Sequence, residues 1–304
     1  MTINDAHCHF FSPKFFDTLL NELLQTGGRP PGDAAGKPIP QVLAWEDPGS
    51  PEQLADRWVA ELDRHGVARA AIIASVPGDE ASVAAAVARH PSRFVGAFVL
   101  NAAAEDALAR ATRAFGELGL RTACLFPAMH HYRLDDERVW KVFEAARLHH
   151  GAIFAHCGVL SIGARRKLGL PSPFDLRLGD PLALAATASR FPHVPVIVPH
   201  FGAGFFREAL MAAEACPNIH LDTSSSNGWI KYYPGLTLAD VFRRALEVVG
   251  ADRLLFGTDS SFFPRGWQTP IFEAQKAVLD EIGADPETQA KILGGNFDRV
   301  FGLS

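Results

Sequence analysis

The sequence predicts a (β/α)8 barrel, the TIM-barrel fold, as a single domain over residues 1–304. Eight short apolar runs are each followed by an amphipathic stretch with helical periodicity. The runs are apolar throughout, which is typical of parallel strands covered on both faces. The first run ends in histidines and phenylalanines, whereas an open doubly wound sheet usually has a glycine-rich loop at that point. Eight such units in 304 residues match the size of a barrel.

The expected elements alternate regularly along the chain. Strands are predicted at 3–9, 70–75, 94–100, 121–126, 152–156, 194–200, 219–223 and 254–259. The helices that follow them are predicted at 13–24, 80–90, 105–118, 135–149, 181–190, 205–215, 238–249 and 270–282.

Capping signals support these helix positions. Ser50 precedes a proline and is followed at the third helical position by Gln53, the pattern of a capping box that starts a helix at Pro51. Asp180 and Thr269 each stand directly before a proline, which repeats the signal of a cap followed by proline.

Two insertions interrupt the regular spacing. Residues 26–49 are rich in glycine and proline and are predicted to form a long loop after the first unit. Residues 159–179 form a second insertion, after the fifth strand. Both would lie over the C-terminal face of a barrel, where such loops shape the active site.

Composition narrows the classes of function. The net charge of −5 argues against a nucleic-acid partner, which usually requires a basic face. No apolar run reaches the roughly 18–20 residues that a membrane span needs, and the first residues do not resemble a signal peptide. Four cysteines without CxxC spacing indicate reduced thiols and a cytoplasmic protein. We expect a small-molecule substrate, and a homo-oligomer is compatible with the sequence.

The first predicted strand carries a pair of candidate metal ligands. His7 and His9 are two residues apart, so their side chains point to the same face of a strand. An isolated HxH pair can simply be two surface histidines. The position of this pair at the end of a barrel strand favours two ligands of one metal ion.

Three further candidates end other predicted strands. His156 ends the fifth strand, His200 the sixth and Asp259 the eighth. Either histidine alone could be a core residue with a satisfied hydrogen bond, and the aspartate could cap the next helix. Together at equivalent strand ends they favour a metal site, because imidazole and carboxylate are the ligands of zinc-class ions.

The same segments resemble the amidohydrolase superfamily, in its amidohydrolase-2 branch, which includes aminocarboxymuconate-semialdehyde decarboxylase and the resorcylate-type decarboxylases. The resemblance covers nearly the whole chain in order. It rests on five segments: Asp5-Ala6-His7-Cys8-His9, Phe154-Ala155-His156-Cys157-Gly158, Pro199-His200-Phe201-Gly202, Leu255-Phe256-Gly257-Thr258-Asp259 and Ile292-Leu293-Gly294-Gly295-Asn296.

The resemblance implies a barrel of the metal-dependent hydrolase type, with defined roles for the candidates. His7, His9, His156 and Asp259 would hold one divalent metal ion, Zn2+ in the first place and Mn2+ as the alternative. His200 would act as an acid or base beside it, with Asp259 as the group that accepts a proton from water. Relatives with two metals carry a bridging lysine on the fourth strand, but residues 121–126 contain none. A single ion is therefore expected.

Two residues are candidates for substrate binding. Arg165 lies in the second insertion, and its guanidinium could hold a substrate carboxylate, although most such charges are simply solvated. Trp229 follows the seventh strand and could form one wall for an aromatic substrate or merely pack the loops.

The leading hypothesis is metal-dependent hydrolysis of a small, carboxylate-bearing organic substrate by an activated water. The alternative is non-oxidative decarboxylation of an unsaturated or aromatic carboxylic acid at the same site. A barrel that has lost its chemistry is a more distant alternative, disfavoured because all five site residues are present.

Overall fold

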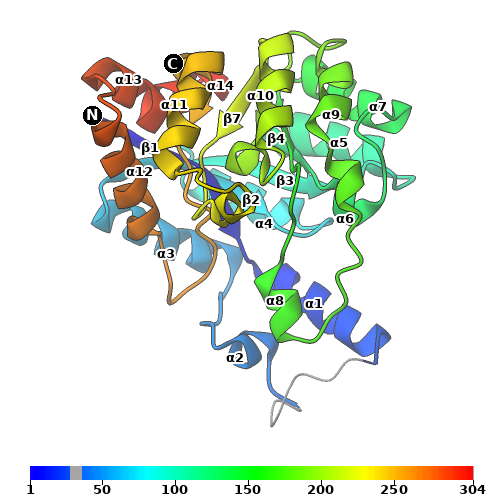
Figure 1. Cartoon of the computed structure of the whole chain (residues 1–304). Coiled ribbons are helices and arrows are strands. Elements are labelled where there is room, and N and C mark those ends of the chain that lie inside the picture. Colours follow the sequence, from blue (N-terminus) through cyan, green and yellow to red (C-terminus); the bar gives the residue numbers. More distant parts are fainter. Residues whose placement is uncertain (28–35, 304) are drawn as a thin grey trace.

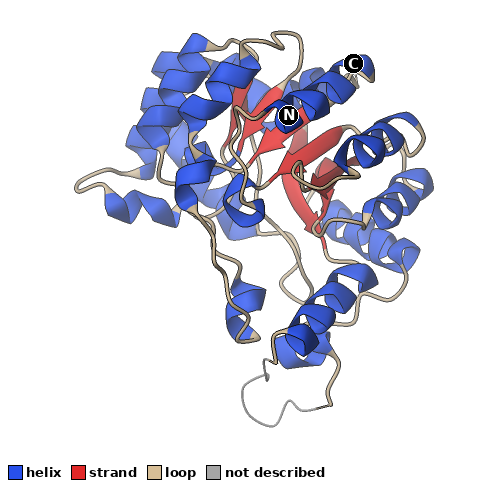
Figure 2. Ribbon diagram, turned by 90° about the vertical axis from the view of Figure 1, so that its right-hand side faces the viewer, coloured by secondary structure: helices blue, strands red, loops and turns tan. Residues whose placement is uncertain are grey.

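Eight parallel strands form the centre of the molecule, and helices surround them (Figure 2). The computed structural model describes residues 1–27 and 36–303. The sheet order follows the chain, with each strand parallel to the next. The strands are β1 (Ile3–Phe10), β2 (Val67–Ala74), β3 (Phe94–Leu100), β4 (Thr122–Leu125), β5 (Ala152–Ala155), β6 (Val196–Val198), β7 (Ile219–Asp222) and β8 (Leu254–Leu255). The predicted fold class is confirmed.

All eight predicted helices are present, with ends that shift by at most two residues. The α-helices are α1 (Pro13–Gln25), α2 (Ile39–Leu43), α3 (Pro51–Arg64), α4 (Glu80–Arg89), α5 (Ala107–Gly116), α6 (Pro127–His130), α7 (Glu137–Leu148), α8 (Gly163–Lys167), α9 (Pro181–Ala188), α10 (Phe206–Ala215), α11 (Leu238–Val249), α12 (Thr269–Glu281), α13 (Pro286–Ala290) and α14 (Asn296–Val300). Single turns of other helix types are η1 (Leu176–Gly179), η2 (Pro199–Gly202), η3 (Gly228–Tyr232), η4 (Ala251–Arg253) and η5 (Lys291–Gly295).

The capping predictions hold at two of the three helix starts. Ser50 and Gln53 form both bonds of the capping box on α3, and the Asp180 side chain accepts from the second residue of α9. Thr269 does not cap α12. It is the first residue of that helix, and its hydroxyl lies 3.0 Å from Nδ1 of His65 instead.

The two faces of the strands pack into separate cores. Cys8 and its outward-facing equivalents contact the surrounding helices, whereas Ala6, Ile73, Phe154 and other inward-facing residues fill the barrel interior. On β1 a register shift between Asp5 and Cys8 interrupts the alternation, so that Ala6 and His7 both face inward, and His9 faces the same cavity as His7. Phe297 on α14 and Phe301, directly after it, add two phenylalanines to the interior core.

The barrel closes between β1 and the segment that follows β8. Three backbone hydrogen bonds join them: Ala6 N–H to Phe256 O at 2.8 Å, Asp259 N–H to His7 O at 2.9 Å, and His9 N–H to Ser260 O at 2.6 Å. We call these bonds the seam. They place both ligand histidines and Asp259 on adjacent backbone segments.

The insertions contain more regular structure than predicted. Residues 26–49 include the helix α2, although residues 28–35 lie outside the described part of the chain, and residues 159–179 include α8 and η1. Together α1, α2 and α8 form what we call the cap, which projects from one end of the barrel (Figure 1). The cap has its own apolar core, with Phe15, Leu43 and Leu168 among its buried members. Burial of these side chains explains why a glycine- and proline-rich segment is helical here.

Among the described residues, none of the helices is long and apolar enough to cross a membrane.

Asp5 stabilises the seam from the barrel side. It is fully buried, and its carboxylate accepts four hydrogen bonds: from the N–H groups of His7 and Thr258, from the Thr258 hydroxyl, and from the Trp267 indole at 2.8 Å. Burial raises the pKa of Asp5, and these hydrogen bonds oppose the rise. Residues on both sides of the seam thus converge on one carboxylate.

We expect Asp5→Asn to lower the free energy of unfolding by about 1–3 kcal/mol, because either orientation of the amide leaves buried donors facing its NH2 group. Urea denaturation measures the change. The matched control is Asp17→Asn on the exposed face of α1, which should change stability by no more than about 0.5 kcal/mol. Equal midpoints for the two variants would contradict this role of Asp5.

Candidate metal centre and its cavity

A cavity of about 520 Å³ opens at the C-terminal ends of the strands, between the barrel and the cap. His7, His9, His156, His200 and Asp259 all line it, so the structure brings every predicted ligand and acid–base residue to one site. Both insertions contribute to the wall, residue 45 from the first and residues 159–164 from the second. The described parts of both insertions therefore border the cavity.

His7 is held in one orientation by buried partners. Its Nδ1 lies 2.7 Å from Asp222 Oδ2 and 2.9 Å from the Ser224 hydroxyl. A carboxylate can only accept, so we assign the proton to Nδ1, which leaves the Nε2 lone pair facing the cavity. Burial alone would lower the pKa of His7, but the adjacent Asp222 and nearby Asp259 carboxylates raise it above its ordinary value.

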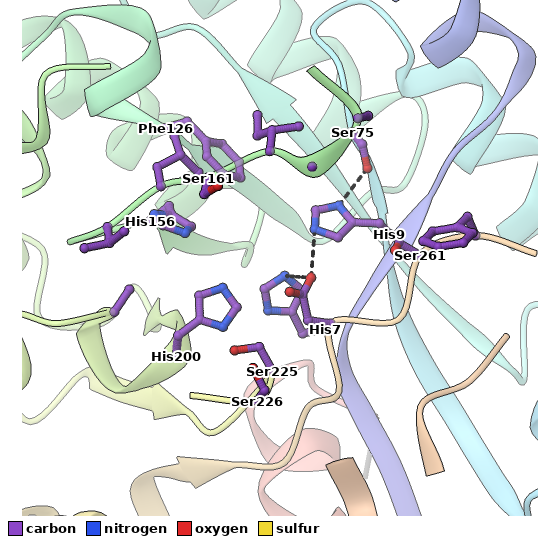
Figure 3. Close-up of a pocket in the computed structure, with 18 of the residues that line it drawn as sticks. His7, His9, Ser75, Phe126, His156, Ser161, His200, Ser225, Ser226 and Ser261 are labelled. Atoms are coloured by element: carbon purple, nitrogen blue, oxygen red, sulfur yellow. Dashed lines mark hydrogen bonds and ion pairs between the residues drawn. The ribbon is translucent and has the colours of Figure 1, made fainter. Parts of the chain in front are cut away.

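His9 shows the same arrangement with a neutral partner. Its Nδ1 lies 2.8 Å from the Ser75 hydroxyl, which itself donates to the Ile73 carbonyl at 2.9 Å. Ser75 must therefore accept from His9, and the Nε2 lone pair again faces the cavity (Figure 3). Burial lowers the pKa of His9, against the opposing effect of Asp259, so the ring is neutral near pH 7.

Asp259 faces both Nε2 atoms. Its Oδ1 lies 3.2 Å from His9 Nε2 and 3.7 Å from His7 Nε2. Burial alone would raise the pKa of Asp259, but the adjacent imidazoles of His9 and His7 lower it below its ordinary value. The carboxylate is therefore ionised.

These three side chains fit a divalent cation. Their ligand atoms all lie within 4.8 Å of one another. Ligand atoms on a tetrahedral zinc lie roughly 3.3–3.6 Å apart, given bonds of about 2.0–2.2 Å, so the observed spacings suit such an ion. Deprotonated ligands are what metal binding requires.

His156 is the predicted ligand that stands apart. It is buried beside Phe126, with ring centroids 5.3 Å apart, and it is not part of the three-residue group (Figure 3). Its Nδ1 is buried without a hydrogen-bond partner among the described residues, which leaves a ligand atom available. Burial and the neighbouring His200 lower the pKa of His156 well below its ordinary value. Its role as a fourth ligand stays a prediction.

His200 occupies the turn η2 after β6, where its backbone φ of 55° is left-handed. Its Nδ1 lies 2.8 Å from the Ser224 hydroxyl and 3.2 Å from the Ser224 carbonyl, which can only accept. Nδ1 therefore carries the proton, and Nε2 is left to accept one. Burial lowers the pKa of His200, so its ring is neutral. Ser224 thus contacts the Nδ1 atoms of both His7 and His200.

The two predicted substrate-binding residues have different surroundings. Trp229 is buried and lines the cavity, with its indole N–H on Asn227 Oδ1 at 3.0 Å. Arg165 does not line the cavity. Its guanidinium pairs with Glu22 on α1 and donates twice to the Pro171 carbonyl. Arg165 therefore fastens α8 to α1 within the cap, and contact with a substrate stays a prediction that would require these bonds to open.

Three residues of the site were not identified from the sequence. Asp222 ends β7, so the rule that selected His156 and Asp259 by their strand-end positions would have found it. Ser224 follows it in a loop and has no such signal. Arg265 lies in the loop after β8. Among the described residues that line the cavity, it is the one lysine or arginine. Gly257 leaves room for this packing, since a Cβ there would lie 3.0 Å from His7 Cβ.

The fold and the donor set define a metal-dependent barrel enzyme. Residues 4–303 match the amidohydrolase family, and the chain therefore belongs to that family, as predicted.

Solved structures show the same fold at low sequence identity. A manganese-bound 5-carboxyvanillate decarboxylase from Novosphingobium aromaticivorans, complexed with 4-hydroxy-3-methoxy-5-nitrobenzoic acid, has 16% identity and a TM-score of 0.67, covering 99% of this chain and 96% of that one. A zinc-bound amidohydrolase from Burkholderia multivorans has 15% identity and a TM-score of 0.65 over all of both chains. A probable 2-pyrone-4,6-dicarboxylic acid hydrolase from Acinetobacter baumannii, with citric acid bound, has 14% identity and a TM-score of 0.61, covering 99% of this chain and 100% of that one.

We expect the purified protein to bind about one equivalent of Zn2+ or Mn2+, and Asp222→Asn to weaken that binding by roughly 10–100-fold, because the asparagine loses the charge that orients His7 and raises its basicity. Metal analysis and calorimetric titration measure both. As a control, Asp63→Asn changes an exposed carboxylate on α3 and should leave the affinity unchanged. Two tightly held ions per chain would overturn the single-metal site.

Proposed function

We propose that the protein hydrolyses a small, carboxylate-bearing organic substrate with one divalent metal ion, zinc or manganese, held by His7, His9 and Asp259, with His156 as the fourth ligand. The observation that supports this most is the convergence of two histidine Nε2 atoms and an ionised carboxylate in one cavity. Manganese and zinc occur in two of the similar structures.

A bound ion of this kind would polarise a substrate carbonyl and lower the pKa of water to about 7. Asp259 is placed to accept the proton of the attacking water at its carboxylate, which is partly exposed to the cavity. His200 keeps its Nδ1–H on Ser224 and can take up a proton at Nε2 and return it to the leaving group. Trp229 and Phe126 supply apolar walls that keep bulk water from the reacting groups.

We expect His200→Asn to retain the metal and to lose turnover by ~10²-fold or more, the scale for loss of a group that transfers protons. In contrast, His7→Ala should lose the metal. Metal content and kcat are measured on the same preparations. If His200→Asn empties the site while His156→Ala does not, the roles of these two histidines are exchanged.

A second candidate is non-oxidative decarboxylation at the same site. The observation that favours it is the aromatic lining of the cavity by Phe11, Phe15, Trp45, Phe126 and Phe262, since a poorly solvated carboxylate loses CO2 more readily than a hydrated one. One of the similar structures is a decarboxylase of an aromatic acid, and another is a probable hydrolase of a dicarboxylic acid.

A product assay separates the two reactions. The metal-loaded protein is incubated with aromatic carboxylic acids on one side and with lactones, esters and amides that carry a carboxylate on the other. We expect ring opening or acyl cleavage with no release of CO2. Stoichiometric CO2 from an aromatic acid would make the second candidate the function, and the His200→Asn variant serves as the control for contaminating activity in both assays.

A further inference from the structure

Four aromatic rings form a continuous stack along one wall of the cavity. Phe15 stacks on Phe11 with centroids 4.0 Å apart, Phe11 on Trp45 at 5.5 Å, and Trp45 on Phe262 at 4.1 Å, with interplanar angles of 6°, 11° and 13°. We call this the aromatic column. All four residues line the cavity: Phe11 follows β1, Phe15 lies on α1, Trp45 follows α2, and Phe262 lies in the loop after β8.

Arg265 closes the end of this column. Its guanidinium carbon lies 4.5 Å from the centre of the Phe262 ring. One nitrogen, Nη2, donates to the Ser261 hydroxyl at 2.5 Å and to the Asp259 carbonyl at 3.3 Å. These two bonds fix the guanidinium beside the backbone of a candidate metal ligand.

The rest of the Arg265 fork is available. Its Nε and Nη1 have no hydrogen-bond or ion-pair partner among the described residues, and the side chain is exposed at the rim of the cavity. This contrasts with Arg165, where all three nitrogens donate to Glu22 or Pro171. Nε and Nη1 of Arg265 therefore remain able to donate to an anionic oxygen, and the fixed positive charge of the guanidinium favours a carboxylate.

We propose that Arg265 and the aromatic column form a subsite for a planar aromatic carboxylate, in which the carboxylate pairs with the unpaired donors of Arg265 and the ring lies against the column. The inference rests on the proposed function in that the same cavity holds the substrate. It deepens that function by naming the substrate class and the residue that selects it.

The charges that line the cavity support a binding position for a substrate carboxylate apart from the candidate metal ligands. Asp259 is the ionised carboxylate that faces His7 and His9, and Arg265 donates to its backbone carbonyl. A substrate with two polar ends can therefore present one end to the ligand cluster and an anionic end to Arg265. The apolar faces between them suit a flat ring.

Binding of matched ligands to the zinc-loaded protein tests the subsite without any need for turnover. Calorimetry compares benzene-1,3-dicarboxylate with 3-carbamoylbenzoate, which replaces one carboxylate by a neutral amide of the same shape. We expect the dicarboxylate to bind at least about tenfold more tightly to the wild type, as a charge-assisted hydrogen bond implies. In Arg265→Ala this preference should disappear, and Arg265→Lys should keep part of it, because lysine retains the charge but not the fork.

The ring preference is tested in the same way. Cyclohexane-1,3-dicarboxylate should bind about three- to tenfold more weakly than the aromatic acid, and Phe262→Leu should reduce that difference. Arg177→Ala is the matched arginine control, since Arg177 is exposed and pairs with Asp175 in the second insertion. It should bind every ligand as the wild type does. Circular dichroism and metal content establish that each variant is folded and loaded.

The outcomes separate this inference from the proposed reaction. An unchanged carboxylate preference in Arg265→Ala, or no binding of any aromatic carboxylate to the wild type, overturns the subsite even if a substrate is hydrolysed. A preference that depends on Arg265, in a protein that turns over none of the compounds, supports the subsite and counts against the proposed reaction. Loss of the preference in Arg165→Ala but not in Arg265→Ala would assign the carboxylate to the cap arginine instead.

Discussion

The seam between β1 and the segment after β8 is the constraint on which the site depends. Its hydrogen bonds involve the backbone of His7, His9 and Asp259 themselves, so closing the barrel and assembling the ligands are one event. The buried Asp5 carboxylate joins the two sides at the same level. A closed barrel can therefore hold ligands from opposite ends of the chain with the accuracy that metal coordination requires.

The sequence predicted the barrel because each strand is covered on both faces and so has an apolar pattern that local reading detects. It also predicted which residues meet, since strand ends in a parallel barrel share one face. His7, His9 and Asp259 illustrate this, because their position along the strand was sufficient. The short extent of β6 and β8 was not predicted, because the backbone leaves the strand conformation just before the functional residue.

Orientation within the site was less accessible to sequence reasoning. His156 satisfies the strand-end rule, yet its ring packs on Phe126 and lies apart from the other candidate ligands. Arg165 was selected by its place in an insertion, but the fold of the cap turns it toward Glu22. Ser224 and Arg265 lie in loops without periodicity, where only three-dimensional contacts reveal a role. For Arg165 and Ser224 the deciding contacts are with Glu22 and His7, which are distant in sequence.

The left-handed backbone conformation of His200 and Asp259 is relevant to whether this barrel has kept a catalytic function. Both residues have φ near 60°, a conformation that costs an L-amino acid roughly 1–2 kcal/mol relative to glycine. A chain that drifted without selection for chemistry would become more stable by accepting glycine at either position. Imidazole and carboxylate instead occupy two of the nine described positions where a residue other than glycine has a positive φ. Selection for a functional site preserves such backbone strain, whereas a scaffold without function would tend to lose it.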